Sequence, residues 1–206
     1  MRRREFIAGT MLGAVGLPII AHAQPASKAR RIGVIVTRAA DDSDTHAVWL
    51  SAFQRELMRL GWQHDTTVRL SIEALSLDPD TARARVQALV SEAPDVIVAV
   101  TTNALKHARA QTSSIPIVLL IVSDPLSQGI VDNLARPSGN ATGFTNLEFS
   151  LLGKWLGMLR EIAPAATRIG LMIGRNNASS AGWYRTFDEL APKAGCVPIP
   201  LPVASE

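Results

Sequence analysis

The sequence contains little cysteine and no recognisable cofactor motif. Its single cysteine, Cys196, excludes a disulfide framework and a cysteine-ligated metal site within the chain. Its four histidines show no paired ligand spacing, so we expect no metal ion. A phosphate-binding loop ending in Gly-Lys-Ser/Thr, a G-x-G-x-x-G segment after the first strand and a Gly-x-Ser-x-Gly elbow are all missing. We therefore expect no bound cofactor.

A clustered positive charge is also lacking. The formal net charge is +3, but residues 2–5 lie in a segment that we expect to be removed, and the remainder has 18 basic and 17 acidic residues. This balance gives no reason to propose a nucleic-acid partner, which would require a clustered basic face. The chain has 206 residues, 47% of them hydrophobic, which is compatible with one or two globular domains.

Residues 1–23 have the features of an export signal. They combine a basic start, an apolar region from Ile7 to Ile20 and the small-x-small cleavage site Ala21-His22-Ala23. The order Arg3-Arg4-Glu5-Phe6-Ile7 is similar to the twin-arginine export motif. A membrane anchor is the alternative, but the apolar region is interrupted by a proline and is too short to span about 30 Å of hydrocarbon. We expect export to the periplasm, with cleavage after Ala23.

Apolar, β-branched runs alternate with amphipathic stretches in the first two thirds of the chain. Four runs are expected to be strands of a parallel sheet buried on both faces: 31–37, 68–75, 95–100 and 115–122. A polar loop at 38–45 follows the first run, and helices are predicted at about 49–60, 79–93 and 102–111. Because parallel neighbours need helical crossovers, this order predicts an α/β fold with a doubly wound parallel sheet.

The pattern restarts after residue 145 but stays short. The predicted elements there are a helix, a strand, a helix and a proline-broken extended run, at 151–159, 168–173, 183–191 and 197–203. Two strands and two helices are marginal as an independent domain, so this half either extends the first or is part of a larger lobe. We expect a first α/β lobe at residues 24–145 and an incomplete second α/β lobe at 146–206.

Small hydroxyl and amide side chains follow the predicted strands, at the edge where open α/β sheets bind ligands. Thr101, Thr102 and Asn103 stand at a helix start, where exposed backbone N–H groups favour a carboxylate; simple capping of that helix is the alternative. Asp124 either accepts from a ligand ammonium or shapes a turn. Thr37 is a further candidate of the same kind. A carboxylate site and an ammonium partner would together favour an amino acid.

The segment from Ser123 to Thr145 also carries a resemblance to a known family. It contains the runs Ser123-Asp124-Pro125, Gly129-Ile130-Val131, Asn133-Leu134, Arg136-Pro137, Gly139-Asn140 and Thr142-Gly143-Phe144-Thr145. These runs resemble the signature of the substrate-binding proteins of ABC transporters, in the tryptophan/tyrosine-type group. The Gly61-Trp62 turn and the strands that begin at Pro94 and Ile115 are similar too. The resemblance covers essentially the whole chain.

The resemblance implies a type I periplasmic-binding fold, in which two α/β lobes are joined by crossing strands and a small solute is clamped between them. The implied protein is not an enzyme, binds an amino acid or a similar organic acid, and delivers it to an ABC permease in the inner membrane. The implied ligand contacts are Thr37, Thr101, Thr102, Asn103, Asp124, Thr145 and Asn146 from the first lobe, and Asn176 and Asn177 from the second.

Two alternatives from other classes stay open at this point. One is an exported α/β hydrolase that uses Asp124 and a loop hydroxyl, although no set of nucleophile, base and orienting residue is recognisable. The other is a sensory protein of the same fold that reports ligand binding to a membrane kinase instead of a permease.

Members of the family normally continue well past the position of Glu206, so we expect this chain to be truncated. A lobe without its opposing wall loses the closure that buries a ligand, and it exposes apolar surface that favours association. Residues 24–206 should therefore bind solute weakly or not at all compared with a C-terminally extended form. Titration calorimetry of both forms checks this, and equal affinities would contradict it.

Overall fold

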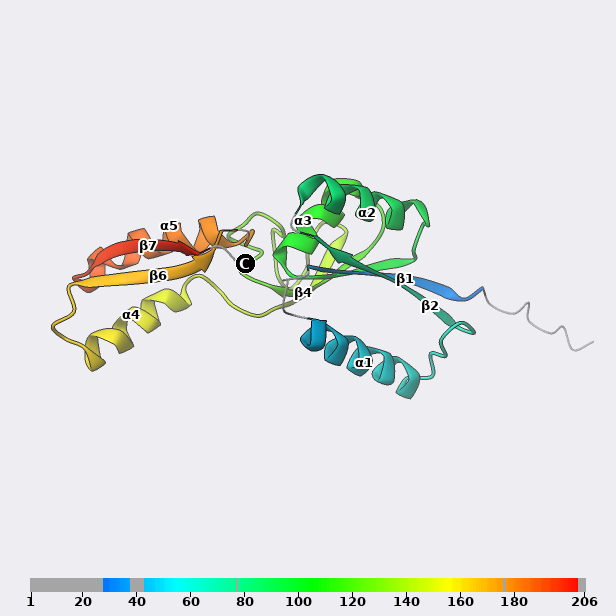
Figure 1. The fold of residues 1–206 in the computed structure, drawn as a ribbon, viewed down its shortest axis with the longest axis horizontal. Helices are drawn as coiled ribbons and strands as arrows, with labels where there is room; N and C mark the ends of the chain where they lie inside the picture. The colour runs from blue at the N-terminus through cyan, green and yellow to red at the C-terminus, as the bar shows by residue number, and fades with distance from the viewer. Residues whose placement is uncertain (1–27, 38–42, 77, 176, 204–206) are drawn as a thin grey trace, which may run out of the picture.

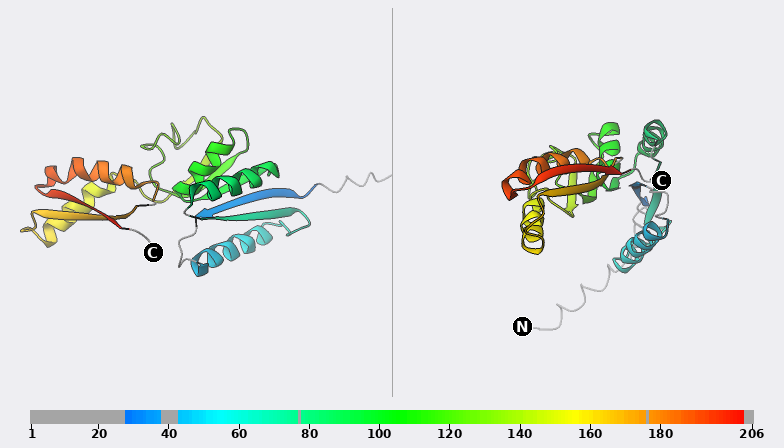
Figure 2. Two further views of the ribbon diagram at one scale, coloured as in Figure 1. Left: turned by 45° about the horizontal axis from the view of Figure 1, so that its top comes forward. Right: turned by 60° about the vertical axis from the view of Figure 1, so that its left-hand side comes forward.

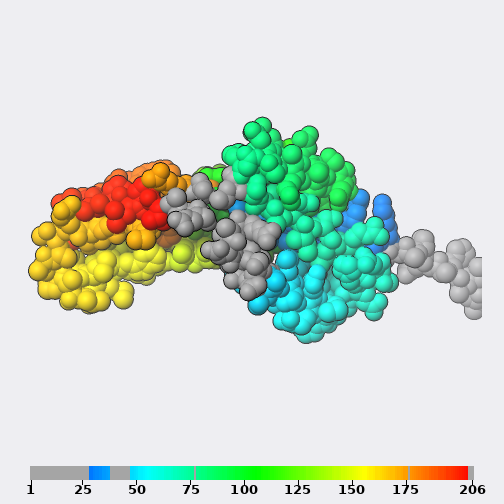
Figure 3. Space-filling view, in the orientation of Figure 1, coloured from blue at the N-terminus to red at the C-terminus, as the bar shows by residue number. Residues whose placement is uncertain are grey.

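The computed structural model describes residues 28–37, 43–76, 78–175 and 177–203. These residues form a five-stranded sheet with its helices, followed by a two-stranded sheet with its own helices. The two units lie next to each other along the long axis of the molecule (Figure 1 and Figure 3). The export signal predicted at residues 1–23 and its cleavage site lie outside the described residues.

The five-stranded sheet is entirely parallel and has the order β2-β1-β3-β4-β5. Its strands are β1 (Arg30–Thr37), β2 (Val68–Leu75), β3 (Val96–Val100), β4 (Ile117–Val122) and β5 (Ala141–Thr145). Its helices are α1 (Ser43–Arg59), α2 (Pro79–Ser91) and α3 (Thr102–Gln111). Helix α1 lies on one face of the sheet, and α2 and α3 lie on the other (Figure 1 and Figure 2). The predicted α/β class with a doubly wound parallel sheet is confirmed.

The apolar strands of this unit are buried because helices cover both faces. Val34 and Val36 point to one face, where Phe53 of α1 packs against their cluster. Ile35 points to the other face and belongs to a cluster that contains Leu89 of α2. Burial on both sides explains why β1 is a continuous apolar run instead of an alternating one.

Local signals at the helix ends are confirmed, but two helix starts were predicted too late. Asp78 caps α2 by accepting from the Thr81 N–H at 2.8 Å, and Pro79 is the first helical residue. Gly61 ends α1 with a φ of 89°, a left-handed conformation that glycine adopts without strain. Helix α1 starts at Ser43, inside the predicted polar loop, and α5 (Ser180–Leu190) starts three residues early. Polar residues that favour helix starts also favour loops, so the first turn of each of these helices was predicted as loop.

Asp95 holds the start of β3 against β1. Its carboxylate accepts from the Arg31 N–H at 2.7 Å, and its own N–H donates to the Arg31 carbonyl at 2.8 Å. The Arg31 hydrogen bond, with a smaller contribution from the Arg30 guanidinium, holds the pKa of Asp95 below its ordinary value. Because the folded pKa is the lower one, the stabilisation is present above the unfolded pKa and is lost as the pH falls through the folded pKa.

The second unit consists of a two-stranded parallel sheet and two helices. Its elements are α4 (Leu151–Ile162), β6 (Arg168–Gly174), α5, a short 3-10 turn (Pro192–Ala194) and β7 (Val197–Val203). The core contains Trp183 of α5, whose ring meets Phe149 edge-on with centroids 4.9 Å apart. Gly182 permits this contact, because a Cβ there would lie 2.2 Å from the Phe149 ring. The unit therefore has a core of its own.

The prolines of β7 occupy alternate positions, and this explains why a proline-broken run forms a strand. Pro198, Pro200 and Pro202 alternate with residues such as Val197, whose N–H donates to Thr167 at 2.8 Å on the β6 side. The three prolines therefore face the outer edge, where a missing N–H costs no ladder hydrogen bond. The three prolines offer no N–H donor at that edge, so they disfavour pairing of a further strand with the outer side of β7.

Strands β4 and β5 pair with an irregularity at the carboxyl end of β4. Their register shifts between Leu119 and Val122, and Ile121 within that interval has a φ of 53°. A β-branched residue in the left-handed region is strained. Opposite this point, the backbone of Gly143 comes so close that a Cβ would lie 2.1 Å from the Leu119 carbonyl oxygen. Glycine is therefore required at position 143.

Replacing Gly143 by alanine should destabilise the five-stranded unit. A Cβ would collide with backbone, and the φ of 147° is unfavourable for any other residue, so we expect a loss of about 1–3 kcal/mol in the free energy of unfolding. Denaturant unfolding measures this. Gly139→Ala is the matched control, since nothing lies within 4 Å of a Cβ there. Equal stability of the two variants would show that β4 and β5 do not approach so closely.

Candidate functional site

The chain order of the sheet reverses between β1 and β3, and this is where ligands of open α/β sheets bind. Thr37 ends β1 and Thr101 follows β3, and their hydroxyls are hydrogen-bonded to each other. Thr101 also caps α3, because its hydroxyl oxygen accepts from the Ala104 N–H at 3.4 Å. Its φ of 92° is strained for a residue other than glycine. The structure therefore places two threonine hydroxyls at the switch point of the sheet, and one of them belongs to a residue with a strained backbone.

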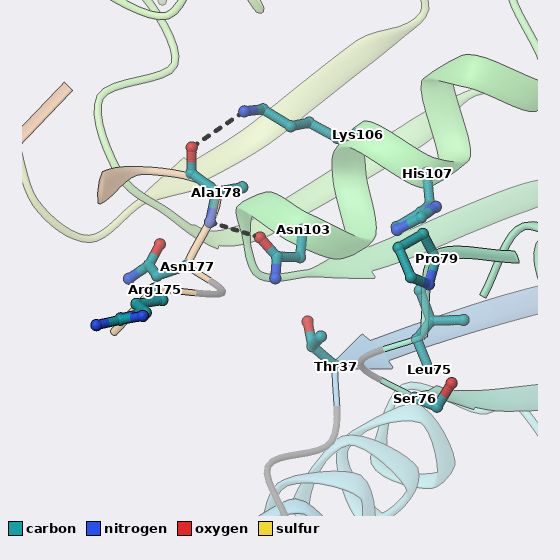
Figure 4. A pocket seen from close by; sticks show the side chains of 10 residues that line it. All are labelled: Thr37, Leu75, Ser76, Pro79, Asn103, Lys106, His107, Arg175, Asn177 and Ala178. Carbon is teal, nitrogen blue, oxygen red and sulfur yellow. Dashed lines mark hydrogen bonds between the residues drawn. The ribbon is translucent and has the colours of Figure 1, made fainter. Parts of the chain in front are cut away.

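A cavity of about 280 Å³ opens beside this point, between the two units (Figure 4). Its size is near the lower end of the range of about 300–1,000 Å³ that is typical of small-molecule sites. The described residues that line it come from both units: Thr37, Leu75, Ser76, Pro79, Asn103, Lys106 and His107 from the first, and Arg175, Asn177 and Ala178 from the second. Three of the predicted contacts, Thr37, Asn103 and Asn177, are thus brought together.

Hydrogen bonds join the two units at one side of the cavity. The Asn103 side-chain oxygen accepts from the Ala178 N–H at 2.7 Å, and the Lys106 ammonium donates to the Ala178 carbonyl oxygen at 3.0 Å (Figure 4). Asn177 accepts from the Ser179 N–H at 2.8 Å through its side-chain oxygen. Residues 177–179 are therefore held against the first turn of α3.

Thr102 lies in this contact and not in the cavity wall. It is buried, and its hydroxyl is hydrogen-bonded to the Ser179 hydroxyl at 3.0 Å and accepts from the Ser123 N–H at 3.4 Å. Ser179 is buried as well. A buried hydroxyl that loses its partner costs about 1–3 kcal/mol, so this pair stabilises the junction between the units.

Asp124 shapes a turn, which is the second of the two roles considered for it. The side chain is 8% exposed, and its two oxygens accept from the Ser127 N–H at 2.9 Å and the Phe149 N–H at 3.1 Å. Its backbone N–H donates to the Leu147 carbonyl oxygen at 2.8 Å. The carboxylate therefore fastens the segment that leads from β5 into α4.

Thr145 and Asn146 do not line the cavity. They border a separate, mainly apolar hollow of about 350 Å³ between α1 and the sheet, together with side chains such as Phe53, Phe144 and Trp49. Thr101 is linked to the cavity through its hydrogen bond to Thr37. Asn176 lies outside the described residues. The predicted set is thus divided between a cavity, a buried junction and an apolar hollow.

Three basic residues of the cavity were missed from the sequence. Lys106 and His107 follow Asn103 by three and four positions, so helical spacing places them on the same side of α3. Arg175 directly follows β6, at the strand end where polar residues were sought in the first unit. The helical spacing on α3 could have identified Lys106 and His107 from the sequence. The position of Arg175 at the cavity depends on how the second unit folds, so no spacing in the sequence predicts it.

Other site types find little support in the part of the chain that the structure describes. Within it, no group of three or more His, Cys, Asp or Glu side chains could hold a metal ion. No described helix combines the length and the apolar character needed to cross a bilayer.

Comparison with known proteins gives a consistent picture. Residues 32–205 match a family model described as ABC transporter substrate binding protein. Over 141 residues the chain is 26% identical to the tyrosine-binding protein of Clostridioides difficile (strain R20291), a match that covers 68% of this chain and 40% of that protein.

Two solved structures have a similar fold. One is a conserved domain protein from Vibrio cholerae O1 biovar eltor, with a TM-score of 0.70 and 21% identity over 85% of this chain and 57% of the other. The second is the ABC domain from Streptococcus pneumonia in complex with L-Trp, with a TM-score of 0.67, 20% identity and the same coverage. The chain spans less than two thirds of the length of these three relatives.

The hydroxyl pair at the junction can be tested with a double-mutant cycle. Thr102→Val and Ser179→Ala should each lower the free energy of unfolding by about 1–3 kcal/mol. The first removes the acceptor of the Ser179 hydroxyl and the Ser123 N–H, and the second removes one of the two hydrogen bonds of the buried Thr102 hydroxyl. The two losses should not add, with a coupling of at least about 0.5 kcal/mol. Denaturant unfolding gives all four values. Thr167→Val, at an exposed threonine, is the control and should change stability by less than about 0.5 kcal/mol. Additive losses would place the hydroxyls out of contact.

Proposed function

Because the chain belongs to the family of ABC transporter substrate-binding proteins, we propose that it binds a small organic solute between its two units and delivers it to an ABC permease. The observation that carries the proposal is the cavity beside the switch point of the five-stranded sheet. Thr37 and Asn103 approach it from the first unit and Asn177 from the second. A ligand held by both units can report its presence through their relative position, which is what a permease would recognise.

The two units correspond in this proposal to two lobes, residues 24–145 and 146–206. Separate sheets and separate buried clusters support the division, since Ile35 and Val34 belong to clusters of the first unit and Trp183 to that of the second. The connection after β5 is fastened by Asp124, through its bonds to Leu147 and Phe149. The chain is exported to the periplasm under this proposal, where the solute is captured.

The protein acts without chemical conversion of its solute. A hydrolase would need a nucleophile next to a base that a third group orients. Asp124, the acid considered for that role, is buried and accepts two backbone N–H groups, so it cannot serve as a base in the cavity. The hydroxyl of Thr37 meets another threonine hydroxyl and not a base.

The solute is an amino acid or a similar organic acid. Two relatives support this class, one named as a tyrosine-binding protein and one solved in complex with L-Trp. The cavity supports it too, because hydroxyl and amide groups suit a carboxylate, and Leu75, Pro79 and Ala178 supply apolar surface for the rest of a small molecule.

Solute binding by the chain tests the proposal, and it is measured at high solute concentrations because residues 24–206 are expected to bind weakly. A thermal-shift panel of amino acids and aromatic or aliphatic carboxylates should yield at least one solute that raises the melting temperature, and titration calorimetry then gives its affinity. Thr37→Val should weaken that affinity about 3- to 10-fold, as expected for the loss of one hydrogen bond of about 0.5–1.5 kcal/mol.

The control variant is Thr142→Val, which removes an exposed hydroxyl on β5 away from the cavity and should leave the affinity unchanged. Equal weakening by both variants would contradict binding in this cavity.

A further inference from the structure

Helix α4 has two apolar faces, and only one of them packs against its own unit. Leu152 and Leu156 are buried and belong to the cluster that contains Trp183 of α5. They account for the side of α4 that is turned toward the two-stranded sheet. In Figure 3, α4 (yellow) runs along the lower border of the second unit. Its second apolar face lies outside the buried cluster.

This second face is a stripe of four residues, which we call the α4 seam. They follow one another at spacings of four, three and four: Leu151, Trp155, Met158 and Ile162. Such spacings are those of the contact positions in a two-stranded coiled coil, which lie along one side of each helix. Met158 is 59% exposed and Ile162 is 78% exposed. A contiguous apolar stripe of this kind on the surface marks a contact site for another surface.

The aromatic residue of the seam is held in place before any partner arrives. The ring of Trp155 is stacked on that of Trp183, with centroids 5.7 Å apart and an angle of 12° between the planes. Trp183 is in turn fixed by its edge-on contact with Phe149. A side chain that is already ordered loses little freedom on association, and tryptophan is enriched among the residues that contribute most to interface energy. The seam is therefore preorganised for contact.

Two opposite charges lie along one flank of the seam. Lys154 and Glu161 are both exposed and are seven positions apart, so helical geometry places them on the same side of α4, one near each end. Neither forms an ion pair with another described residue. The flank therefore carries a positive charge toward the start of the helix and a negative charge toward its end.

This charge pattern is complementary to itself in one orientation. A two-fold axis that makes two helices antiparallel brings this flank of one copy beside the same flank of the other. Lys154 of each copy then lies beside Glu161 of the second copy, which gives two ion pairs. A parallel arrangement would instead place both charges beside the opposite flank, where Leu159 stands. The charges therefore favour an antiparallel second copy.

We propose that α4 is a self-association surface, on which a second copy of the chain packs its own α4 in antiparallel orientation. Leu151 of one copy then lies opposite Ile162 of the other, and Trp155 opposite Met158. The contact is isologous, as in most dimers with two-fold symmetry. Helix α4 has 12 residues, fewer than the roughly 20–30 a side of a standard stable interface, so the dimer should dissociate on dilution.

This inference goes beyond solute binding and does not depend on it. No residue of the α4 seam is among the described residues that line the cavity between the units. Association through the seam therefore leaves the described cavity lining free, and either claim can fail without the other.

Sedimentation equilibrium over a dilution series of residues 24–206, which include every described element, tests the surface. Met158→Glu should raise the dimer Kd at least about tenfold, because it places a charge in the apolar contact. Met58→Glu is the matched control, since Met58 is 57% exposed on helix α1 of the first unit, and it should leave the Kd unchanged.

Met172→Glu tests the rival surface, because Met172 is 68% exposed on β6. It too should leave the Kd unchanged. Dissociation by Met172→Glu but not by Met158→Glu would place the contact on the two-stranded sheet and contradict the inference. A chain that stays monomeric throughout the series would also overturn it, and would leave the seam to another occupant, such as a different protein or a further segment of a longer form.

A charge swap tests the antiparallel orientation. Lys154→Glu and Glu161→Lys should each raise the Kd about 3- to 10-fold at low salt and less at high salt, because each turns two attractions into repulsions. The double variant should return the Kd to within about twofold of the unchanged chain, since it restores both pairs with the charges exchanged.

The two single substitutions control for each other. They change the net charge in opposite directions, so equal weakening cannot come from overall charge. Both also suit the helix dipole, with an acid nearer the start of α4 and a base nearer its end, so α4 should stay folded, as circular dichroism checks. A double variant as weak as the single ones would show that Lys154 and Glu161 do not meet across the dimer, and the antiparallel pairing would be wrong.

Discussion

The structure depends on one short contact, in which residues 177–179 dock onto the first turn of α3. Asn103 accepts from Ala178 and Thr102 is hydrogen-bonded to Ser179, at sequence separations of 75 and 77 positions. These bonds join the five-stranded and two-stranded units at the carboxyl end of β3, which is where an open α/β sheet exposes its ligand site. The cavity exists because this contact holds a wall of the second unit opposite the switch point of the first.

The same contact explains why polar residues at the strand ends have different roles. Thr102 and Asp124 are buried and stabilise the junction and the turn after β4, whereas Thr37 and Asn103 face the cavity. Helix caps, buried hydrogen bonds between units and ligand contacts all use small hydroxyl and amide side chains. Residue type and position along the chain therefore identify the edge of the sheet that carries the site. They do not distinguish residues that line the cavity from residues that stabilise the fold around it.

The fold was predictable to the extent that it is locally encoded. The sequence predicted the apolar runs of β1 and β3, the Asp78 cap and the Gly61 helix end. Each of these features reflects burial or backbone geometry within a few residues. Arg175 could not be placed in this way. Its place in the same cavity as Asn103 follows from how the two units pack, and no local pattern encodes that. The early starts of α1 and α5 were missed because polar first turns resemble loops.

The central claim is that solute binds between the two units at the carboxyl edge of the five-stranded sheet. A crystal structure of the full chain with its tightest-binding solute tests this most directly. The account predicts ligand density bordered by Thr37, Asn103 and Asn177, with the hydrogen bond between Asn103 and Ala178 retained. Density in the apolar hollow between α1 and the sheet, beside Phe53 and Phe144, with the cavity between the units empty, would contradict it.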